Sequence, residues 1–215
     1  MTDPSALDQP LLTPDLDAAR AALDAGQPLE AAALLEGHAD PAARHWLGYA
    51  YVELARYDEA RDLYRRLLEE AQAAGDPGAH RFLHQLGMVE RCAGQVAAAL
   101  RLFEAERAEL ARQGLGALER AVNGYELAVC LHALGEQRPA HAALAAAFAD
   151  AQEADDPMTL GCLWRASGDF ACAEEGDGER AHDAYTNART AFEQAGDALA
   201  AAEMTARLAG KVRSD

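Results

Sequence analysis

Four residues that could bind a soft metal recur at a spacing of four: His80, His84, Met88 and Cys92. In a helix this spacing places all four side chains on one face. However, the series extends over about 18 Å at 1.5 Å per residue, which is far too long for one tetrahedral site. Only two neighbours could bind the same ion. We therefore interpret the series as groove or core side chains and predict neither a metal site nor a cofactor.

Sequence signatures of catalysis are missing. The chain has no phosphate-binding Gly-rich loop after a strand, no His-Glu-x-x-His and no Gly-x-Ser-x-Gly motif. The segment Gly176-Asp177-Gly178-Glu179 lacks the remaining ligands of a calcium loop, so we interpret it as a turn and the start of a helix. We expect that the protein is not an enzyme.

Compartment signals favour a cytoplasmic protein. The four cysteines (Cys92, Cys130, Cys162 and Cys172) form no Cys-x-x-Cys pair, and each falls inside an expected helix, which is typical of reduced structural thiols. The N-terminus lacks a basic start followed by an apolar stretch, and no run of eighteen apolar residues occurs. Neither secretion nor membrane spanning is indicated.

The net charge of −17 limits the partners. Such an acidic surface repels phosphate backbones and anionic lipid head groups, and no Lys/Arg cluster is dense enough to reverse the field locally. We expect no nucleic acid and no membrane among the partners. We interpret the charge as a source of solubility, with recruitment of a basic partner as the alternative.

A recurring pattern of small and large residues, which we call the repeated phrase, predicts the structural units that must position any site. Its central alanines, Ala60, Ala99, Ala140 and Ala181, lie 39, 41 and 41 residues apart. One supersecondary unit copied at such a period predicts a stacked array. Aromatic residues make up only 6% of the chain and no alternating β-branched run is present, so the units should be helical.

Two further landmarks keep the same register. Small residues lie five positions before each alanine: Ala55, Gly94, Gly135 and Gly176. Turn residues lie fifteen positions after it: Gly75, Gly114, Asp155 and Gly196. Asp followed by Pro then marks the next helix start, because the carboxylate accepts free amide protons and proline fits the first turn. Each unit therefore predicts helix, turn, helix, turn.

This register divides the chain into expected segments within one domain. A leader without periodicity precedes a degenerate first unit, four full repeats, a capping helix and a short tail. The expected boundaries are 1–14 for the flexible leader, 15–40, 41–77, 78–116, 117–157 and 158–197 for the units of the 15–210 array, 198–212 for the cap and 213–215 for the tail.

The chain resembles the tetratricopeptide repeat (TPR) family. That motif places a large residue, a small pair and another large residue on the first helix, then an alanine and an aromatic residue on the second. The matching positions are Leu47-Gly48, Tyr51, Ala60 and Tyr64; Leu83, Leu86-Gly87, Ala99 and Phe103; Leu127-Ala128, Leu131, Ala140 and Leu144; and Trp164, Ser167-Gly168, Ala181 and Tyr185.

Two departures from the family pattern stand out. The usual TPR period is about 34 residues, so the longer units here are similar to those of kinesin light chains and of the sensor domains of bacterial transcription activators. The last unit also has one extra residue between Gly168 and Ala181. That residue could re-aim the first helix or lengthen the turn, and the sequence leaves both open.

The resemblance implies an all-α, right-handed superhelical solenoid of antiparallel helix pairs. Its concave groove would be lined by the first helix of each unit. The expected groove residues are His45, Tyr49, Val52, Glu53, Arg81, His84, Met88, Arg91, Cys92, Val122, Tyr125, Val129, His132, Cys162, Arg165 and Asp169. Their mixture of hydrogen-bonding and aromatic groups suits an extended or helical peptide. The alternative is that residues such as Tyr125, Met88 and Val129 only pack between neighbouring units.

A chaperone-docking clamp, which in this family grips a C-terminal carboxylate with Lys, Asn and Arg, is not expected. The corresponding positions carry His45, Tyr49, Gln85, Val122 and Glu126. A glutamate at the carboxylate position would repel the ligand.

Three function classes remain open at the sequence level. We expect first a non-enzymatic interaction scaffold that binds a peptide or helix of another protein in the groove. A ligand- or peptide-responsive regulatory sensor is the second hypothesis. The third is a structural module that forms homodimers through its terminal faces.

Overall fold

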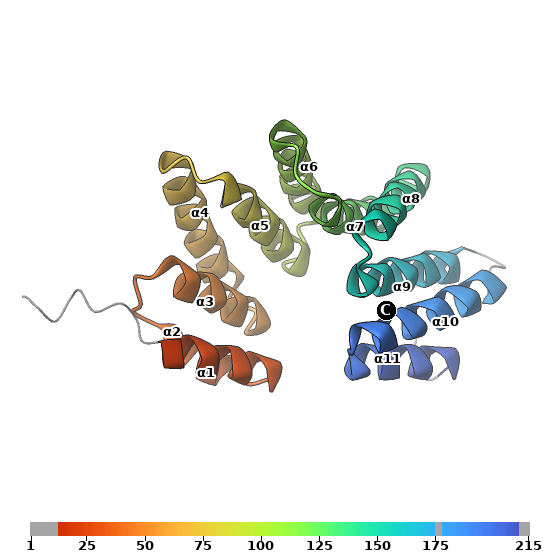
Figure 1. Cartoon of the computed structure of the whole chain (residues 1–215), viewed down its shortest axis with the longest axis horizontal. Coiled ribbons are helices and arrows are strands. Elements are labelled where there is room, and N and C mark those ends of the chain that lie inside the picture. Colours follow the sequence, from red (N-terminus) through yellow and green to blue (C-terminus); the bar gives the residue numbers. More distant parts are fainter. Residues whose placement is uncertain (1–12, 175–177, 211–215) are drawn as a thin grey trace, which may run out of the picture. The chain divides into compact units, whose positions relative to one another are not determined.

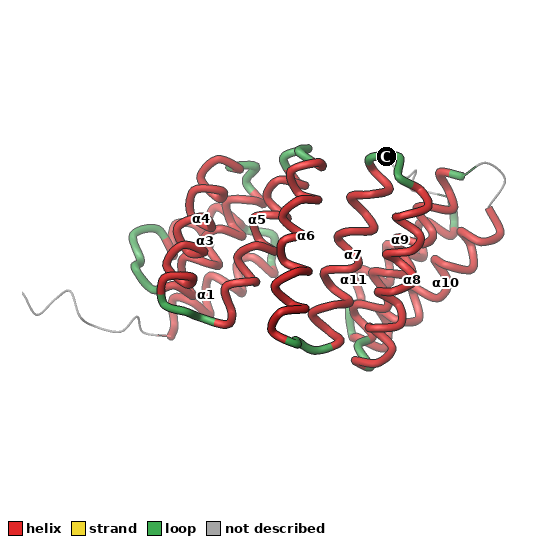
Figure 2. The backbone as a smooth tube through the Cα atoms, turned by 90° about the horizontal axis from the view of Figure 1, so that it is seen from above, coloured by secondary structure: helices red, strands yellow, loops and turns green. Residues whose placement is uncertain are grey.

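The computed structural model describes residues 13–174 and 178–210. Over these ranges the chain is helical and contains no strand (Figure 2). The helices are α1 (Thr13–Asp24), α2 (Pro28–Leu35), α3 (Pro41–Glu53), α4 (Tyr57–Ala73), α5 (His80–Cys92), α6 (Val96–Gln113), α7 (Ala117–Ala133), α8 (Gln137–Ala154), α9 (Pro157–Ala173), α10 (Gly178–Ala195) and α11 (Ala198–Leu208), with a 3₁₀ turn, η2 (Pro77–Ala79), before α5. The all-α prediction is confirmed.

Two compact units divide the chain, Met1–Ala99 and Leu100–Asp215, and each is described by itself. Within a unit, helices that follow one another in sequence pack together, as α3 with α4 and α7 with α8 (Figure 1). First helices of adjacent pairs also touch, as α1 with α3 and α7 with α9. The organisation into one continuous array, the repeat boundaries and the superhelix remain predictions.

The Asp-Pro landmarks are helix caps, as the sequence predicted. The Asp40 carboxylate accepts hydrogen bonds from the amides of Ala42 (2.8 Å) and Ala43 (3.1 Å). Asp156 accepts one from Thr159 N at 2.7 Å. Asp197, which no proline follows, caps α11 by accepting from Ala200 N at 2.9 Å. These side chains satisfy amide groups that have no partner inside the helix.

Small turn residues after α3, α4, α5, α7 and α8 adopt a left-handed conformation. Gly94, Gly135 and Gly75 have φ between 66° and 80°, where glycine has no steric penalty. Ala55 and Asp155 take the same conformation with φ of 56° and 51°, although each carries a Cβ atom. The positions that keep the repeat register are therefore the positions where the chain reverses.

A glycine on a first helix faces a ring on the following second helix. A Cβ atom at Gly48 would lie 2.4 Å from the Tyr64 ring, and one at Gly168 would lie 2.5 Å from the Tyr185 ring. Tyr64 is fully buried, and its hydroxyl donates to the His45 carbonyl oxygen at 2.9 Å. This close packing fixes the face that each first helix presents.

Three sequence expectations concern parts outside the described residues. Residues 1–12 of the leader, residues 175–177 of the turn that the extra residue between Gly168 and Ala181 could lengthen, and the 211–215 end have no described structure. Helix α1 begins at Thr13, inside the expected leader, and α11 ends at Leu208.

Candidate functional site

The expected groove residues all lie on the first helices α3, α5, α7 and α9. Tyr49, Glu53, Arg81 and Cys92 are exposed, and the other residues of the set are half-buried. They fall into one group on α3 and α5 and another on α7 and α9, one in each unit.

His45 is the centre of an aromatic cluster on α3 and α5. Its ring lies 5.7 Å from that of Trp46, 5.6 Å from Tyr49 and 6.3 Å from Phe82, all with edge-to-face geometry. The Trp46 and Tyr49 rings are 5.4 Å apart. Edge-to-face contacts direct ring hydrogens at a neighbour's π-face, which fixes the rings relative to one another. The hydrogen bond from Tyr64 to the His45 carbonyl holds this part of α3.

A recess of about 330 Å³ opens beside this cluster, and we call it the aromatic recess. It is lined by Pro41, Ala42, His45, Trp46, Asp76, Arg81 and Phe82. The volume is within the range of about 300–1,000 Å³ that is typical of ligand sites. Rigid aromatic walls can bury an apolar side chain of a ligand without first losing much conformational freedom.

The aromatic recess carries one cation and one anion. Arg81 donates from Nε to the Gly78 carbonyl oxygen at 3.3 Å and makes no ion pair within the described part of the chain. Asp76 is engaged in capping, since its Oδ1 accepts from Gly78 N at 2.7 Å. Burial, and secondarily the charge of Arg81, lower the pKa of His45. The recess therefore presents a neutral imidazole and one guanidinium free to meet a ligand carboxylate.

The remaining expected residues of the first unit extend along the same helices. Val52 is half-buried on α3, and Glu53 is exposed at its end. On α5 the Met88 sulfur accepts from Arg91 Nη2 at 3.6 Å. His84 is half-buried. The structure places His45 and Arg81 in the recess lining and Tyr49 beside His45, while the other residues of this group are not part of the lining.

The group on α7 and α9 is tied into the packing of its own unit. Tyr125 and Val129 pack against a core that includes Ala128, Leu144 and Leu163. Tyr125 is hydrogen-bonded to Arg165, which also donates to Glu203 at 3.4 Å. Burial raises the pKa of the Tyr125 hydroxyl. The sequence left open that Tyr125 and Val129 only pack between neighbouring helix pairs. The contacts in this unit agree with that alternative.

Asp169 takes part in a network that holds the last helix. Tyr185 donates its hydroxyl proton to Asp169 Oδ1 at 2.7 Å, and Arg207 of α11 pairs with the same carboxylate. Arg207 also contacts Glu203 at 2.9 Å. Because its acceptor oxygen is shared by two internal donors, Asp169 serves the docking of α11 in this structure.

His132 is stacked on a ring. Its imidazole lies 3.9 Å from the Phe170 ring at an interplanar angle of 10°, and its Nδ1 is buried without a hydrogen-bond partner in the described residues. Nearby, His141 Nε2 lies 2.6 Å from Glu174 Oε1. Val122 and Cys162 are half-buried, and burial raises the pKa of the Cys162 thiol.

Sequence reasoning missed Trp46, Phe82 and Asp76 as neighbours of His45. Trp46 and Phe82 belong to a chain in which aromatic residues are only 6% of the total. Because aromatic residues are rare in this chain, two of them close to a predicted groove residue could have indicated a site. The repeat motif instead selected Tyr49 and His84 as groove residues.

No metal or membrane feature is found within 13–174 and 178–210. These residues contain no group of three His, Cys, Asp or Glu side chains arranged to hold a metal ion. The four residues spaced by four all lie on α5, namely His80, His84, Met88 and Cys92, and Cys92 is exposed at the end of the helix. No helix in these ranges combines the length and the apolar character needed to cross a membrane.

Comparisons with known proteins show the fold. No family model matches the chain, and no curated protein matches it. Among solved structures, a thermophilic TPR protein from Thermus thermophilus is 21% identical with a TM-score of 0.65, over 93% of this chain and 97% of that one. A Rap protein complexed with Competence and Sporulation Factor is 13% identical with a TM-score of 0.67, and the match covers 92% of this chain but only 62% of the Rap chain.

A third solved structure is also similar. A kinesin light chain-type array of nearly identical TPR-like repeats from Podosopora anserina is 20% identical with a TM-score of 0.50, over 93% of this chain and 94% of that one. These identities are low, so the similarity is one of architecture. The chain has the TPR-like helical-repeat fold.

Proposed function

We propose that this protein is a non-enzymatic interaction module that binds a peptide or helix of another protein on its first helices. The observation that carries the proposal is the aromatic recess on α3 and α5. It combines fixed rings with a guanidinium that has no carboxylate partner among the described residues, and Tyr49 (38% exposed) lies beside it against His45 and Trp46. Such groups can bury an apolar side chain of a peptide and pair with a neighbouring carboxylate.

The remaining expected groove residues are proposed to extend this surface. Val52, Glu53, His84, Met88 and Arg91 follow the recess along α3 and α5. Val122, Tyr125, Val129, His132 and Arg165 form the corresponding stretch on α7 and α9, where internal packing leaves less side-chain surface free. We propose a protein partner rather than nucleic acid, since the net charge of −17 repels phosphate backbones. We also propose a cytoplasmic location.

A displayed library of random peptides, selected against the whole protein, tests the proposal without requiring an identified partner. Tyr49→Ala and Arg81→Gln should each weaken a selected peptide by roughly tenfold or more, as expected for central contacts of an interface. Matched controls on the second helix α4, Tyr57→Ala and Arg65→Gln, should leave affinity unchanged. All four variants should keep the melting temperature of the unaltered protein.

Equal binding by the site and control variants would place the peptide elsewhere on the protein. Unfolding of Tyr49→Ala would assign Tyr49 to the core. A selection that yields no binding peptide would contradict peptide recognition altogether.

The second candidate function is a sensor whose shape responds to a bound effector. The Rap structure, solved with Competence and Sporulation Factor, has a similar fold and motivates this alternative. X-ray scattering of the protein with and without a selected peptide distinguishes the two, since a scaffold keeps its profile and a sensor changes it.

Homodimerisation through the terminal helices, where Leu29 and Leu199 are exposed, is the third candidate. A monomer in light scattering at high concentration would exclude it.

A further inference from the structure

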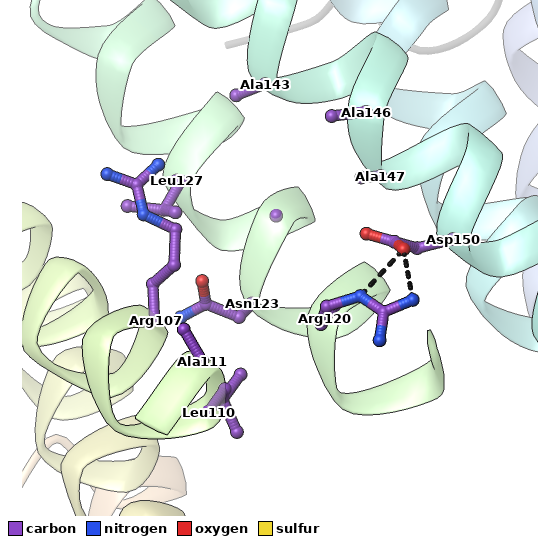
Figure 3. A pocket seen from close by; sticks show the side chains of 11 residues that line it. Arg107, Leu110, Ala111, Arg120, Asn123, Leu127, Ala143, Ala146, Ala147 and Asp150 are labelled. Atoms are coloured by element: carbon purple, nitrogen blue, oxygen red, sulfur yellow. Dashed lines mark hydrogen bonds and ion pairs between the residues drawn. The ribbon is translucent and has the colours of Figure 1, made fainter. Parts of the chain in front are cut away.

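A second recess lies on α6, α7 and α8, apart from the aromatic recess, and we call it the alanine pocket. It is lined by Arg107, Leu110, Ala111, Arg120, Asn123, Gly124, Leu127, Ala143, Ala146, Ala147 and Asp150, and it has a volume of about 160 Å³ (Figure 3). All of these residues belong to the second unit. Apart from the motif residue Leu127, the lining residues belong neither to the sequence motifs nor to the proposed groove.

The pocket exists because three helices meet with small residues between them. A Cβ atom at Gly124 would lie 2.8 Å from the Ala147 Cβ, so α7 and α8 are closely packed there. The methyl groups of Ala143, Ala146 and Ala111 then leave space where larger side chains would fill it. Helix packing alone would tolerate a larger residue at Ala146, because this side chain is exposed.

The polar groups around the pocket are satisfied from within the protein. Asn123 is 1% exposed and donates from Nδ2 to the Phe103 carbonyl oxygen and to Glu106 Oε2, each at 2.8 Å. Arg120 pairs with Asp150 at 2.8 Å and with Glu153 at 3.3 Å. The floor of the pocket therefore does not depend on water for these hydrogen bonds, which favours an apolar occupant.

The rim supplies one unused charge. Figure 3 shows Arg107 along one side of the pocket, opposite the Arg120–Asp150 pair. Arg107 is exposed and makes no hydrogen bond or ion pair with any described residue. A guanidinium beside an apolar hole is complementary to an apolar group that is followed by a carboxylate.

Size decides between a free small molecule and a side chain. Sites for small ligands usually measure about 300–1,000 Å³, and this pocket is about half the lower limit. An engineered apolar cavity of about 150 Å³ accepts a benzene ring. The alanine pocket thus matches one aromatic or branched side chain.

We propose that the alanine pocket anchors a single aromatic side chain of a partner protein, with Arg107 pairing with one carboxylate next to that side chain. Its lining residues lie on α6, α7 and α8, and none of them lines the aromatic recess.

Amide spectra of the whole protein, labelled with ¹⁵N, provide the test, because Gly124 in the pocket wall is a direct reporter. The probe is the tripeptide acetyl-Asp-Phe-Asp-amide, compared with acetyl-Asp-Ala-Asp-amide and acetyl-Asn-Phe-Asn-amide. We expect the first peptide to shift the Gly124 signal with half-saturation on the order of millimolar, as befits one side chain and one ion pair. The alanine peptide should cause no shift, and the neutral peptide should bind roughly threefold to tenfold more weakly.

Matched variants identify the pocket. Ala146→Leu should fill it and abolish the Gly124 shift, while Ala145→Leu, on the outer side of α8, should retain it. Arg107→Gln should weaken the acidic peptide to the affinity of the neutral one, and Arg101→Gln, exposed on the same helix, should not. The melting temperatures of both leucine variants should equal that of the unaltered protein, which shows that a lost Gly124 shift is not caused by unfolding.

Several outcomes would overturn the proposal. An undiminished shift in Ala146→Leu, no shift with any peptide, or equal binding of the alanine peptide would remove the pocket as an anchor. Equal binding of the neutral peptide would remove the carboxylate contact to Arg107. Phenylacetate binding as tightly as the tripeptide would indicate a free aromatic acid. A Gly124 shift that grows with protein concentration alone, and disappears in Ala146→Leu, would indicate a second copy of this chain.

Discussion

Three glycines of the first helices lie against aromatic rings of the following helix, and two of them, Gly48 and Gly168, belong to the repeated phrase. At Gly48, Gly161 and Gly168, an added Cβ atom would lie 2.4 to 2.6 Å from a carbon of a tyrosine or phenylalanine ring. Nonbonded carbon atoms attract each other at about 3.5–4.0 Å and repel strongly at such short distances. Gly48 and Gly168 thereby set the distance between the helices of a pair, which explains why a small residue recurs at their position while the groove positions vary.

Gly48→Ala should destabilise the protein by about 1–3 kcal/mol, because the added methyl group forces α3 and α4 apart. In a Tyr64→Leu background the same change should cost much less, since the ring it meets is absent. Urea unfolding of the four proteins of this cycle measures the coupling. Gly178→Ala is the control, as a Cβ atom there meets nothing within 4 Å. An equal cost in both backgrounds would show that Tyr64 is not the obstacle.

Ala55→Gly should stabilise the protein by roughly 0.5–1 kcal/mol. Ala55 has φ of 56°, a left-handed conformation that costs about 1–2 kcal/mol for a residue with a Cβ atom, whereas glycine loses about 0.5–1 kcal/mol of chain entropy. Asp155→Gly should act in the same direction. Ala145→Gly, in the middle of α8, should instead lose about 1 kcal/mol. Urea midpoints compare the variants, and a loss of stability in Ala55→Gly would contradict the strain argument.

At the scale of the elements, local chemistry predicted the helices well. The aspartate caps at Asp40, Asp156 and Asp197 act on amides two or three residues away, so the sequence alone contains both partners. Side-chain contacts between different helices were harder to predict from the sequence. Trp46 and Phe82 meet around His45 only because α3 and α5 pack with a particular rotation, which no local pattern encodes. The alanine pocket escaped prediction because it is defined by missing side-chain volume on three helices.

Packing between α7 and α9 should make stability depend on pH. Burial, with a smaller contribution from the charge of His141, lowers the pKa of His132 in the folded protein, and the pKa of His45 is lowered as well. The unfolded chain then binds more protons near its ordinary histidine pKa of about 6.5. The stabilisation is complete above that pH and is lost as the pH falls toward the lowered folded-state values.

His132→Phe should reduce the slope of stability against pH between about pH 7.5 and 5, the range around the ordinary histidine pKa. Phenylalanine keeps the stacking on Phe170, and His132 Nδ1 has no hydrogen-bond partner to lose within the described chain. Denaturant unfolding at several pH values compares the variant with the unaltered protein, in which His45 retains part of the slope. Glu174, whose pKa is lowered by its hydrogen bond to His141, affects stability only at lower pH. Identical slopes would assign the pH dependence to other groups.

At the scale of the whole molecule, stability is expected to be local. In a helical-repeat fold each helix pair contacts its neighbours in sequence, so the free energy is approximately a sum of unit and nearest-neighbour contributions. A single buried core would instead transmit any damage to every helix. The contacts within each of the two units are mostly between helices that are neighbours in sequence, as α3 with α4 and α9 with α10.

Gly168→Ala should therefore lower hydrogen-exchange protection mainly in α9, α10 and α11. The added methyl group meets the Tyr185 ring, and Tyr185 donates to Asp169, which also holds Arg207 of α11. Gly48→Ala should act mainly on α3 and α4 through Tyr64. Native-state exchange resolved by mass spectrometry assigns each loss to a helix, and the two variants serve as controls for each other. A uniform loss of protection over both units in either variant would mean that the chain opens only as a whole, and that its repeats fold as one cooperative block.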